Sequence, residues 1–191
     1  MEGNTSHRIF VAINLPPATK KEILYWQHEI NDKSLALNWT PVEKIHLTML
    51  FLGNITEWEI KKLSGLIDDA ISEFRPFSLN LRRFGVIKRQ GRPSVFYIKP
   101  RGCRRLTILQ TKIAEAAKQE NIGKISRRSF QPHITLGRFR SGEIDRKLLS
   151  RWRRQKVDIN FSVRSVDIMT SDMSLRPSQY TKLHSSYFDE S

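Results

Sequence analysis

One short pattern, a histidine and a threonine two positions apart among apolar residues, occurs twice in this 191-residue chain. The first copy lies in IHLTMLFL (residues 45–52) and the second in QPHITLGR (residues 131–138), nearly half the chain apart. Successive side chains of a β-strand point to opposite faces, so His46 shares a face with Thr48, and His133 shares a face with Thr135. The pattern therefore predicts two strands that each bury an apolar face and present an imidazole and a hydroxyl on the other.

Two imidazoles and two hydroxyls suit acid–base chemistry on a phosphate. Because the pKa of free imidazole is about 6.5, one ring can accept a proton near neutral pH while the other donates one. Threonine is stiff at χ1 and holds its hydroxyl in place for phosphate oxygens. A single His-x-Thr on a strand usually has a structural role, but two copies in matching apolar contexts favour catalysis.

A metal site is the competing interpretation of paired histidines. Zinc needs at least three protein ligands, and the sequence offers no third candidate at a suitable spacing. The single cysteine, Cys103, forms no intramolecular disulfide and no cysteine-based zinc site. His7, His28 and His184 have no repeated context, and we expect them to be structural or exposed. We therefore expect no metal.

The charge of the chain is strongly positive, with 33 Lys and Arg residues against 19 Asp and Glu residues and a net charge of +14. This excess indicates either a solvated basic surface or a polyanionic partner, and it does not distinguish RNA from DNA or from small anions. Arginine contributes much of the excess, which gathers in five segments: 81–93, 99–105, 124–130, 138–140 and 151–156.

Hydrophobic periodicity predicts a mixture of strands and helices. We expect strands at 8–15, 45–52, 77–87, 94–100, 132–139, 157–169 and 179–188, an extended piece at 37–41, and helices at 18–31, 56–74, 104–120 and 144–154. Thr56 and Glu59 form a capping-box pattern at the start of the second helix. Similar series of elements over 8–74 and 77–154 indicate a weak internal duplication, whose two His-x-Thr strands would face each other across a cleft. No linker-like segment interrupts the chain, so we expect residues 1–191 to be a single domain.

A soluble, cytoplasmic protein is expected. Apolar residues make up 39% of the chain, and none of the apolar runs approaches the roughly 20 residues of a membrane span. The start MEGNTSHRIFVAINLPP lacks the long apolar run and small-residue cleavage site of a signal peptide.

Four segments carry a resemblance to a known family. They are RIFVAINLP near the start, HLTMLFLGNI at 46–55, SFQPHITLGRFR at 129–140 and MTSDMSLRPSQYTKL at 169–183. Together they resemble the RNA 2′,3′-cyclic phosphodiesterase branch, or 2′-5′ RNA ligase family, of the two-histidine phosphoesterases. The resemblance covers essentially the whole chain. It implies an α+β fold with two pseudo-symmetric lobes, each with an antiparallel sheet and outer helices, flanking a central cleft.

The resemblance also implies an activity: hydrolysis of 2′,3′-cyclic phosphate ends of RNA to 2′-phosphomonoesters without metal or cofactor, and reversible 2′-5′ RNA ligation. The enzyme would be a monomer acting on RNA ends. The residues carried over are His46 and His133 as the acid–base pair, Thr48 and Thr135 as phosphate-oxygen donors, Arg138 as a phosphate neutraliser, and Phe10 as either a cleft or a core aromatic. Tyr180 and Phe96, the latter where the family commonly has Trp, are further aromatic candidates. Arg127 and Arg128 are expected to bind the body of the RNA.

Two alternatives remain open. Other phosphoesterases of the superfamily act on 2′-5′ oligonucleotides or cyclic nucleotide-sugar phosphates. A protein of another class, a non-catalytic RNA-binding module, would use the two His-x-Thr strands as scaffold. Turnover of a small 2′,3′-cyclic nucleotide separates an enzyme from a binding module.

Overall fold

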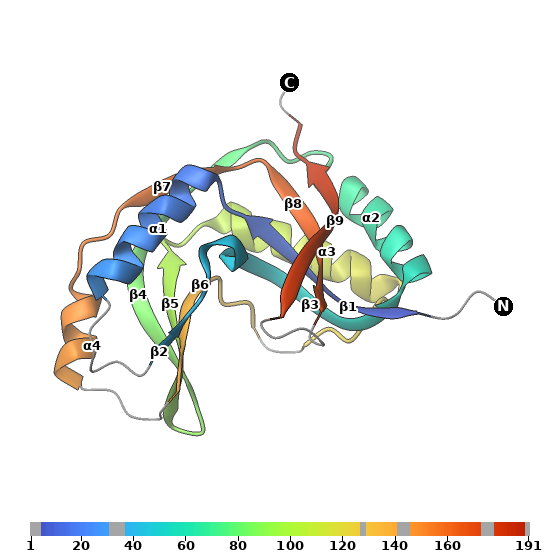
Figure 1. Cartoon of the computed structure of the whole chain (residues 1–191). Coiled ribbons are helices and arrows are strands. Elements are labelled where there is room, and N and C mark those ends of the chain that lie inside the picture. The colour runs from blue at the N-terminus through green and yellow to red at the C-terminus, as the bar shows by residue number, and fades with distance from the viewer. Residues whose placement is uncertain (1–4, 31–36, 127–128, 141–145, 173–177, 190–191) are drawn as a thin grey trace.

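A computed structural model describes residues 5–30, 37–126, 129–140, 146–172 and 178–189 (Figure 1). The helices are α1 (Pro17–Ile30), α2 (Glu57–Ile71), α3 (Arg104–Gln119) and α4 (Arg146–Arg153), with a short 3₁₀ turn at Val42–Lys44. The strands are β1 (Ser6–Asn14), β2 (Leu37–Trp39), β3 (His46–Thr56), β4 (Phe77–Arg89), β5 (Arg92–Pro100), β6 (Ile134–Phe139), β7 (Ile159–Val163), β8 (Ser165–Asp172) and β9 (Gln179–Tyr187).

Within these residues the strands form one curled sheet of nine strands, in the order β7-β4-β5-β6-β3-β1-β8-β9, with β2 paired to β6. All neighbouring strands in this sheet run antiparallel. The β3–β6 pair joins the two halves of the sheet at its middle, through the pair Leu47 and Ile134. From the sequence, we expected the two His-x-Thr strands to face each other across a cleft. They are instead direct neighbours in one sheet.

The helices connect the two halves of the sheet. Helix α1 follows β1 along the chain but contacts β7 at the far end of the sheet, and α3 follows β5 but contacts β3 in the other half. Helices α2 and α3 lie together over the half that contains β1, β3, β8 and β9, and α4 contacts β4. Each half of the sheet is therefore covered partly by a helix from the other half of the chain.

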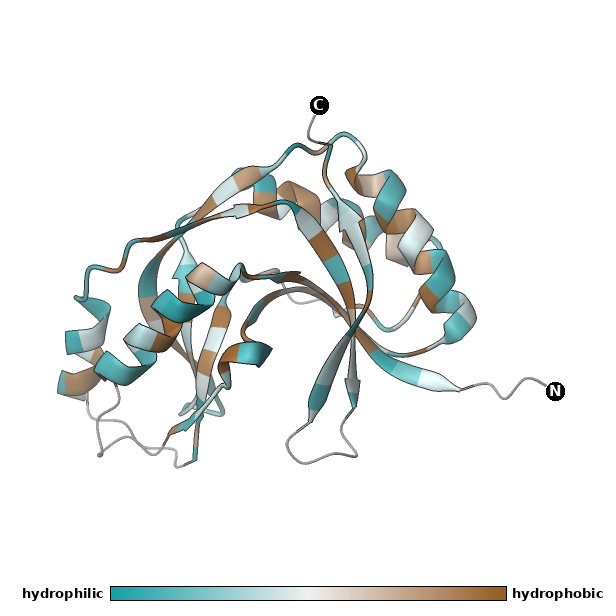
Figure 2. Ribbon diagram, turned by 45° about the horizontal axis from the view of Figure 1, so that its top comes forward, coloured by the Kyte–Doolittle hydropathy of each residue, from teal (hydrophilic) through white to brown (hydrophobic). Residues whose placement is uncertain are grey.

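Hydrophobic and hydrophilic residues alternate along much of the sheet (Figure 2). On β1, Ile9, Val11 and Ile13 are buried in the main core. Phe10 and Ala12, on the opposite face of the same strand, form a small separate cluster with Met169. Because Asn14 and Ala12 pair with His46 and Thr48, this second face of β1 adjoins the face that carries the first His-x-Thr pattern.

The predicted capping box is confirmed, and a tight turn joins two of the predicted strands. Thr56 caps α2 as expected: its backbone N–H donates to Glu59 Oε2 at 2.8 Å, and its hydroxyl accepts from the Glu59 backbone N–H at 3.3 Å. Strands β4 and β5 form a hairpin around Gln90 and Gly91, whose φ angles are +48° and +76°. Two consecutive residues with positive φ suit a tight hairpin turn, and glycine adopts this conformation without strain.

One strand prediction is wrong. The segment 157–169 was expected to be a single strand, but the chain changes partners at Arg164. Strand β7 pairs with β4 at one end of the sheet, and β8 pairs with β1 in the other half. Strand β7 alternates between buried and exposed residues, whereas β8 has four consecutive buried residues, Val166 to Met169, and both patterns are compatible with a strand. Only the long-range pairing separates them.

No helix in the described part of the chain is both long and apolar enough to cross a membrane.

Candidate active site

The two His-x-Thr patterns meet where β3 pairs with β6. Leu47 and Ile134 are directly opposite each other, and both are fully buried. In an antiparallel pair, residues on either side of such a pair point to the other face of the sheet. His46 therefore lies on the same face as Thr135, and Thr48 on the same face as His133. The four side chains that the sequence predicted to act together therefore gather on one face of the sheet, around a local twofold axis. This face, which carries His46, Thr48, His133 and Thr135, is called the reacting face.

The two imidazoles are oriented by the same device. His46 Nδ1 lies 2.7 Å from the carbonyl oxygen of Lys44, and His133 Nδ1 lies 2.8 Å from that of Gln131. A carbonyl oxygen only accepts hydrogen bonds, so Nδ1 is the donor in both contacts. In the neutral form of either ring, Nε2 then carries the free lone pair. Both histidines are thus set to accept or release a proton at Nε2.

The surroundings of His46 favour its neutral form. Its Nε2 lies 3.0 Å from Thr48 Oγ1, and its ring centroid lies 5.0 Å from that of Phe10 and 5.5 Å from that of Tyr180. The pKa of His46 is lowered, mainly because the ring is buried. The hydrogen bond to the Lys44 carbonyl acts in the opposite direction but has the smaller effect. The positive charges of Lys20 and His133 lower this pKa further. The effect of His133 places the two imidazoles within electrostatic reach of each other.

Lys20 is a site residue that was not predicted from the sequence. It lies in the first turns of α1, where its ammonium donates to the carbonyl oxygen of Glu43 at 3.2 Å. Burial lowers the pKa of Lys20, and the carboxylate of Glu43 acts in the opposite direction. Its positive charge is one of the causes that lower the pKa of His46. A lysine at the start of a helix has no distinguishing sequence signal, because this position becomes functional only through the packing of α1.

His133 has an aromatic neighbour of its own. The ring of Tyr97 on β5 meets His133 edge-on, with a centroid distance of 5.6 Å, and Tyr97 pairs across the strands with Thr135. The Tyr97 ring lies over Gly85 so closely that a Cβ at position 85 would come within 2.4 Å of it. Glycine is therefore required at position 85 for this placement of Tyr97. Neither residue was predicted from the sequence.

Arg138 lies on the reacting face because of a β-bulge. It lies three positions after Thr135, so regular alternation would place the two side chains on opposite faces. However, β6 contains one extra residue against β5: Thr135 pairs with Tyr97, Gly137 pairs with Phe96, and Leu136 has no partner. The bulge restores the shared face, and the exposed Arg138 follows opposite Val95.

A buried glutamine secures this bulge. The side-chain amide of Gln27 on α1 donates to the carbonyl oxygens of Leu136 and Thr40, both at 2.9 Å. The backbone N–H of Thr40 also donates to the Leu136 carbonyl, at 2.8 Å. The unpaired residue of the bulge thus has its carbonyl fully bonded, which stabilises the backbone that presents Arg138.

The aromatic candidates are placed differently. Phe10 is 3% exposed and packs on His46, so it belongs both to a small buried cluster and to the wall of the site. Tyr180 lies between solvent and His46, with its ring 5.3 Å from that of Phe10. Phe96 is fully buried and stacks on Phe84 in the core, so it has no surface on which a substrate base could stack.

The other histidines lie outside the cluster. His7 contacts Glu57, His184 contacts Asp68, and His28 is exposed on α1. Among the residues that the structure describes, no group of three or more His, Cys, Asp or Glu side chains is arranged to hold a metal ion. Arg127, Arg128 and residues 173–177 of the C-terminal motif lie outside the described residues.

Comparison with known proteins connects this geometry to a family. The family model of the 2′-5′ RNA ligase superfamily matches residues 15–174. A Bacillus subtilis (strain 168) protein named RNA 2′,3′-cyclic phosphodiesterase is 29% identical over 135 residues, which cover 70% of this chain and 72% of the relative. A relative of the same name from Methanocaldococcus jannaschii is 29% identical over 154 residues, covering 81% of this chain and 83% of its own.

Solved structures agree with the fold. Escherichia coli LigT, crystallised with 3′-AMP, superposes with a TM-score of 0.82 at 24% identity and covers 97% of this chain and 100% of its own. The Thermus thermophilus protein TT0787 gives a TM-score of 0.80 at 21% identity, covering 95% of this chain and 97% of its own. These similarities confirm the two-lobed α+β fold that was expected from the sequence.

Proposed function

Because this chain belongs to the 2′-5′ RNA ligase superfamily, we propose that it is an enzyme that hydrolyses 2′,3′-cyclic phosphate ends of RNA to 2′-phosphomonoesters. The observation that carries this proposal is the pair of histidines on adjacent strands, each with Nδ1 bound to the carbonyl two residues before it. The name that the Bacillus and Methanocaldococcus relatives share supports the cyclic phosphate as substrate.

In the proposed reaction, one neutral imidazole takes a proton at Nε2 from a water molecule. The water oxygen forms a bond to phosphorus while the bond from phosphorus to O3′ breaks. The second imidazole, protonated, gives its Nε2 proton to O3′, and the product keeps the phosphate on O2′. Since the proton taken from water balances the proton given to O3′, no further reactant is needed.

The remaining side chains stabilise charge on the phosphate. The hydroxyls of Thr48 and Thr135 donate to the non-bridging oxygens, which requires Thr48 to exchange its contact with His46 Nε2 for the substrate. Arg138 and Lys20 supply positive charge near the phosphate, and both stabilise the negative charge that develops on the phosphate oxygens. With the 5′-hydroxyl of a second RNA end in place of water, the same groups would catalyse the same attack on the cyclic phosphate, in which the bond from phosphorus to O3′ breaks and a 2′-5′ linkage between the RNA ends forms.

The test uses 2′,3′-cyclic AMP and a short RNA ending in a 2′,3′-cyclic phosphate, with product identity read by phosphorus NMR. We expect a 2′-phosphate from both substrates, at a rate that EDTA leaves unchanged. A 3′-phosphate product would contradict the assigned leaving group. Loss of activity in EDTA with rescue by zinc or magnesium would contradict the metal-free mechanism, and inactivity on both substrates would contradict the function itself.

A further inference from the structure

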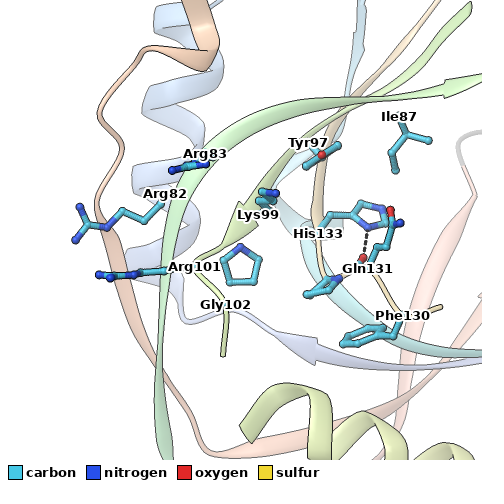
Figure 3. A pocket seen from close by; sticks show the side chains of 12 residues that line it. Arg82, Arg83, Ile87, Tyr97, Lys99, Arg101, Gly102, Phe130, Gln131 and His133 are labelled. Carbon is cyan, nitrogen blue, oxygen red and sulfur yellow. Dashed lines mark hydrogen bonds between the residues drawn. The ribbon is translucent and has the colours of Figure 1, made fainter. Parts of the chain in front are cut away.

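A large basic cavity adjoins His133 on the side away from His46. Its volume is about 780 Å³, within the usual range of roughly 300–1,000 Å³ for ligand pockets. The strands β4 and β5 and the segments that follow β5 and precede β6 form its walls (Figure 3). Four basic side chains and no acidic one are among the described residues of its lining: Arg82, Arg83, Lys99 and Arg101.

Among the described residues, three of these cations have no carboxylate that compensates their charge. Arg82 lies 3.7 Å from Asp158, which balances its charge. Within the described part of the chain, no ion pair joins Arg83, Lys99 or Arg101 to an acidic side chain. All three side chains are exposed. They are therefore available to an anion that enters the cavity.

The strand register brings two of these cations together. Arg83 on β4 and Lys99 on β5 are directly opposite each other. Like charges at such a cross-strand pair destabilise a sheet. An anion held between them would turn this repulsion into attraction, which is a physical reason to expect a negatively charged ligand at this place.

The cavity also has aromatic walls. Tyr97 and Phe130 are partly exposed within the lining, and Tyr97 is held in place over Gly85. Unpaired cations beside aromatic rings are the combination with which proteins bind single-stranded nucleic acid, through backbone phosphates and stacked bases. His133 and Tyr97 belong to both the cavity and the reacting face. An RNA strand that lies in the cavity therefore leads directly to the reacting phosphate.

Building on the proposed function, we propose that this cavity is a subsite for the nucleotides that precede the cyclic phosphate on the same RNA strand. Arg83, Lys99 and Arg101 bind their backbone phosphates, and Tyr97 and Phe130 provide faces for their bases. The subsite makes the enzyme selective for oligonucleotide ends over cyclic mononucleotides, since a mononucleotide does not extend into it.

The experiment compares the double variant Arg83→Gln/Lys99→Gln with the wild type on two substrates, 2′,3′-cyclic AMP and a tetranucleotide RNA ending in a 2′,3′-cyclic phosphate. We expect KM for the tetranucleotide to rise at least about tenfold, the scale of one lost hydrogen bond to a charged group, with kcat unchanged. The kinetics on cyclic AMP should not change. The salt dependence of tetranucleotide binding should also weaken, by roughly 0.7 in the log–log slope for each phosphate that the variant no longer neutralises.

A matched control removes two positive charges elsewhere. Lys61→Gln/Lys118→Gln changes exposed residues on α2 and on the last turn of α3, which do not line the cavity. This variant should match the wild type on both substrates. The melting temperature of the Arg83/Lys99 variant should be no lower than that of the wild type, because the substitution removes a like-charge pair.

Other outcomes would overturn the subsite. Equal losses on both substrates would show that Arg83 and Lys99 bind the reacting phosphate or stabilise the fold. Unchanged kinetics on both would show that the cavity does not take the RNA strand, and a defect confined to ligation would assign it to the incoming RNA end. A wild type inactive on both substrates would instead refute the proposed function. The subsite would then be tested by binding of the tetranucleotide alone, and equal affinity of variant and wild type would refute it.

Discussion

Replacing His46 or His133 by asparagine tests the proposed acid–base pair with little disturbance of the backbone. An asparagine amide can donate to the carbonyl two residues before it, as Nδ1 of His46 and His133 does, but it has no group in the place of Nε2. The variants His46→Asn and His133→Asn thus remove Nε2, the atom proposed to transfer the proton, and keep the hydrogen bond that orients the side chain.

The magnitude follows from the role of proton transfer. General acid or base catalysis by one side chain contributes about 10²–10⁴-fold, or roughly 2.7–5.4 kcal/mol of barrier. We expect each single variant to lose this much in kcat on 2′,3′-cyclic AMP. The double variant should lose less than the product of the two single losses, because groups that act on one transition state are not additive.

Stability should respond unequally. His46 packs against both Phe10 and Tyr180, so its replacement removes ring contacts and should lower the melting temperature. Among the described rings His133 contacts that of Tyr97, so its replacement should lower the melting temperature less. His28→Asn is the matched control, since this histidine is exposed on α1 and should change neither the rate nor the melting temperature.

The assay measures initial rates over a range of substrate concentrations together with thermal unfolding of each variant. Near-wild-type kcat in either folded variant would refute the reasoning. Fully multiplicative losses would also refute it, because they would show that the two imidazoles act in separate steps.

Further predictions concern the hydroxyls, the pH dependence of stability and the bulge. Thr48→Val and Thr135→Val keep the β-branched shape and should each cost about 1.5–3 kcal/mol of transition-state stabilisation, measured as a roughly 10- to 100-fold loss of kcat; an unchanged kcat would remove that hydroxyl from the mechanism. Because folding lowers the pKa of His46, the unfolded chain binds more protons just below pH 6.5, so the free energy of unfolding should fall as the pH drops from about 7 through that window. His46→Asn should flatten this part of a denaturation-versus-pH curve, and an equally steep curve would contradict the assignment. Gln27→Met should lower the free energy of unfolding by about 1–3 kcal/mol and also reduce kcat through displacement of Arg138, whereas unchanged chemical denaturation would show that the bulge does not need the amide.

Local sequence was sufficient for the features that depend on neighbouring residues. The alternation of His46, Leu47 and Thr48 specifies which side chains share a face, because the geometry of a strand has a period of two whatever it pairs with. The capping box at Thr56 and Glu59 is equally local, and the structure contains it as expected. The repeated pattern in apolar context was enough to select the four residues at the centre of the proposed site.

Tertiary structure decided how these pieces act together. Strand pairing placed Leu47 opposite Ile134 and so brought the two His-x-Thr patterns onto one face, whereas the sequence had suggested strands facing each other across a cleft. The same long-range pairing divided the segment 157–169 between two ends of the sheet, although its local pattern is that of one strand.

Arg138 shows the division most clearly. Its three-residue spacing from Thr135 would place it on the opposite face of a regular strand. The bulge at Leu136 changes this, because β6 has one more residue there than its partner β5. The buried side-chain amide of Gln27 donates to the carbonyl oxygen of that extra residue. The packing of the fold likewise decides that the charge of Lys20 acts on the pKa of His46 and that Phe96 is buried in the core. Alternation is a property of consecutive residues, and the chain carries it from the start. The neighbours of a side chain across the sheet come from segments far away in sequence, so they are decided only when the whole fold forms.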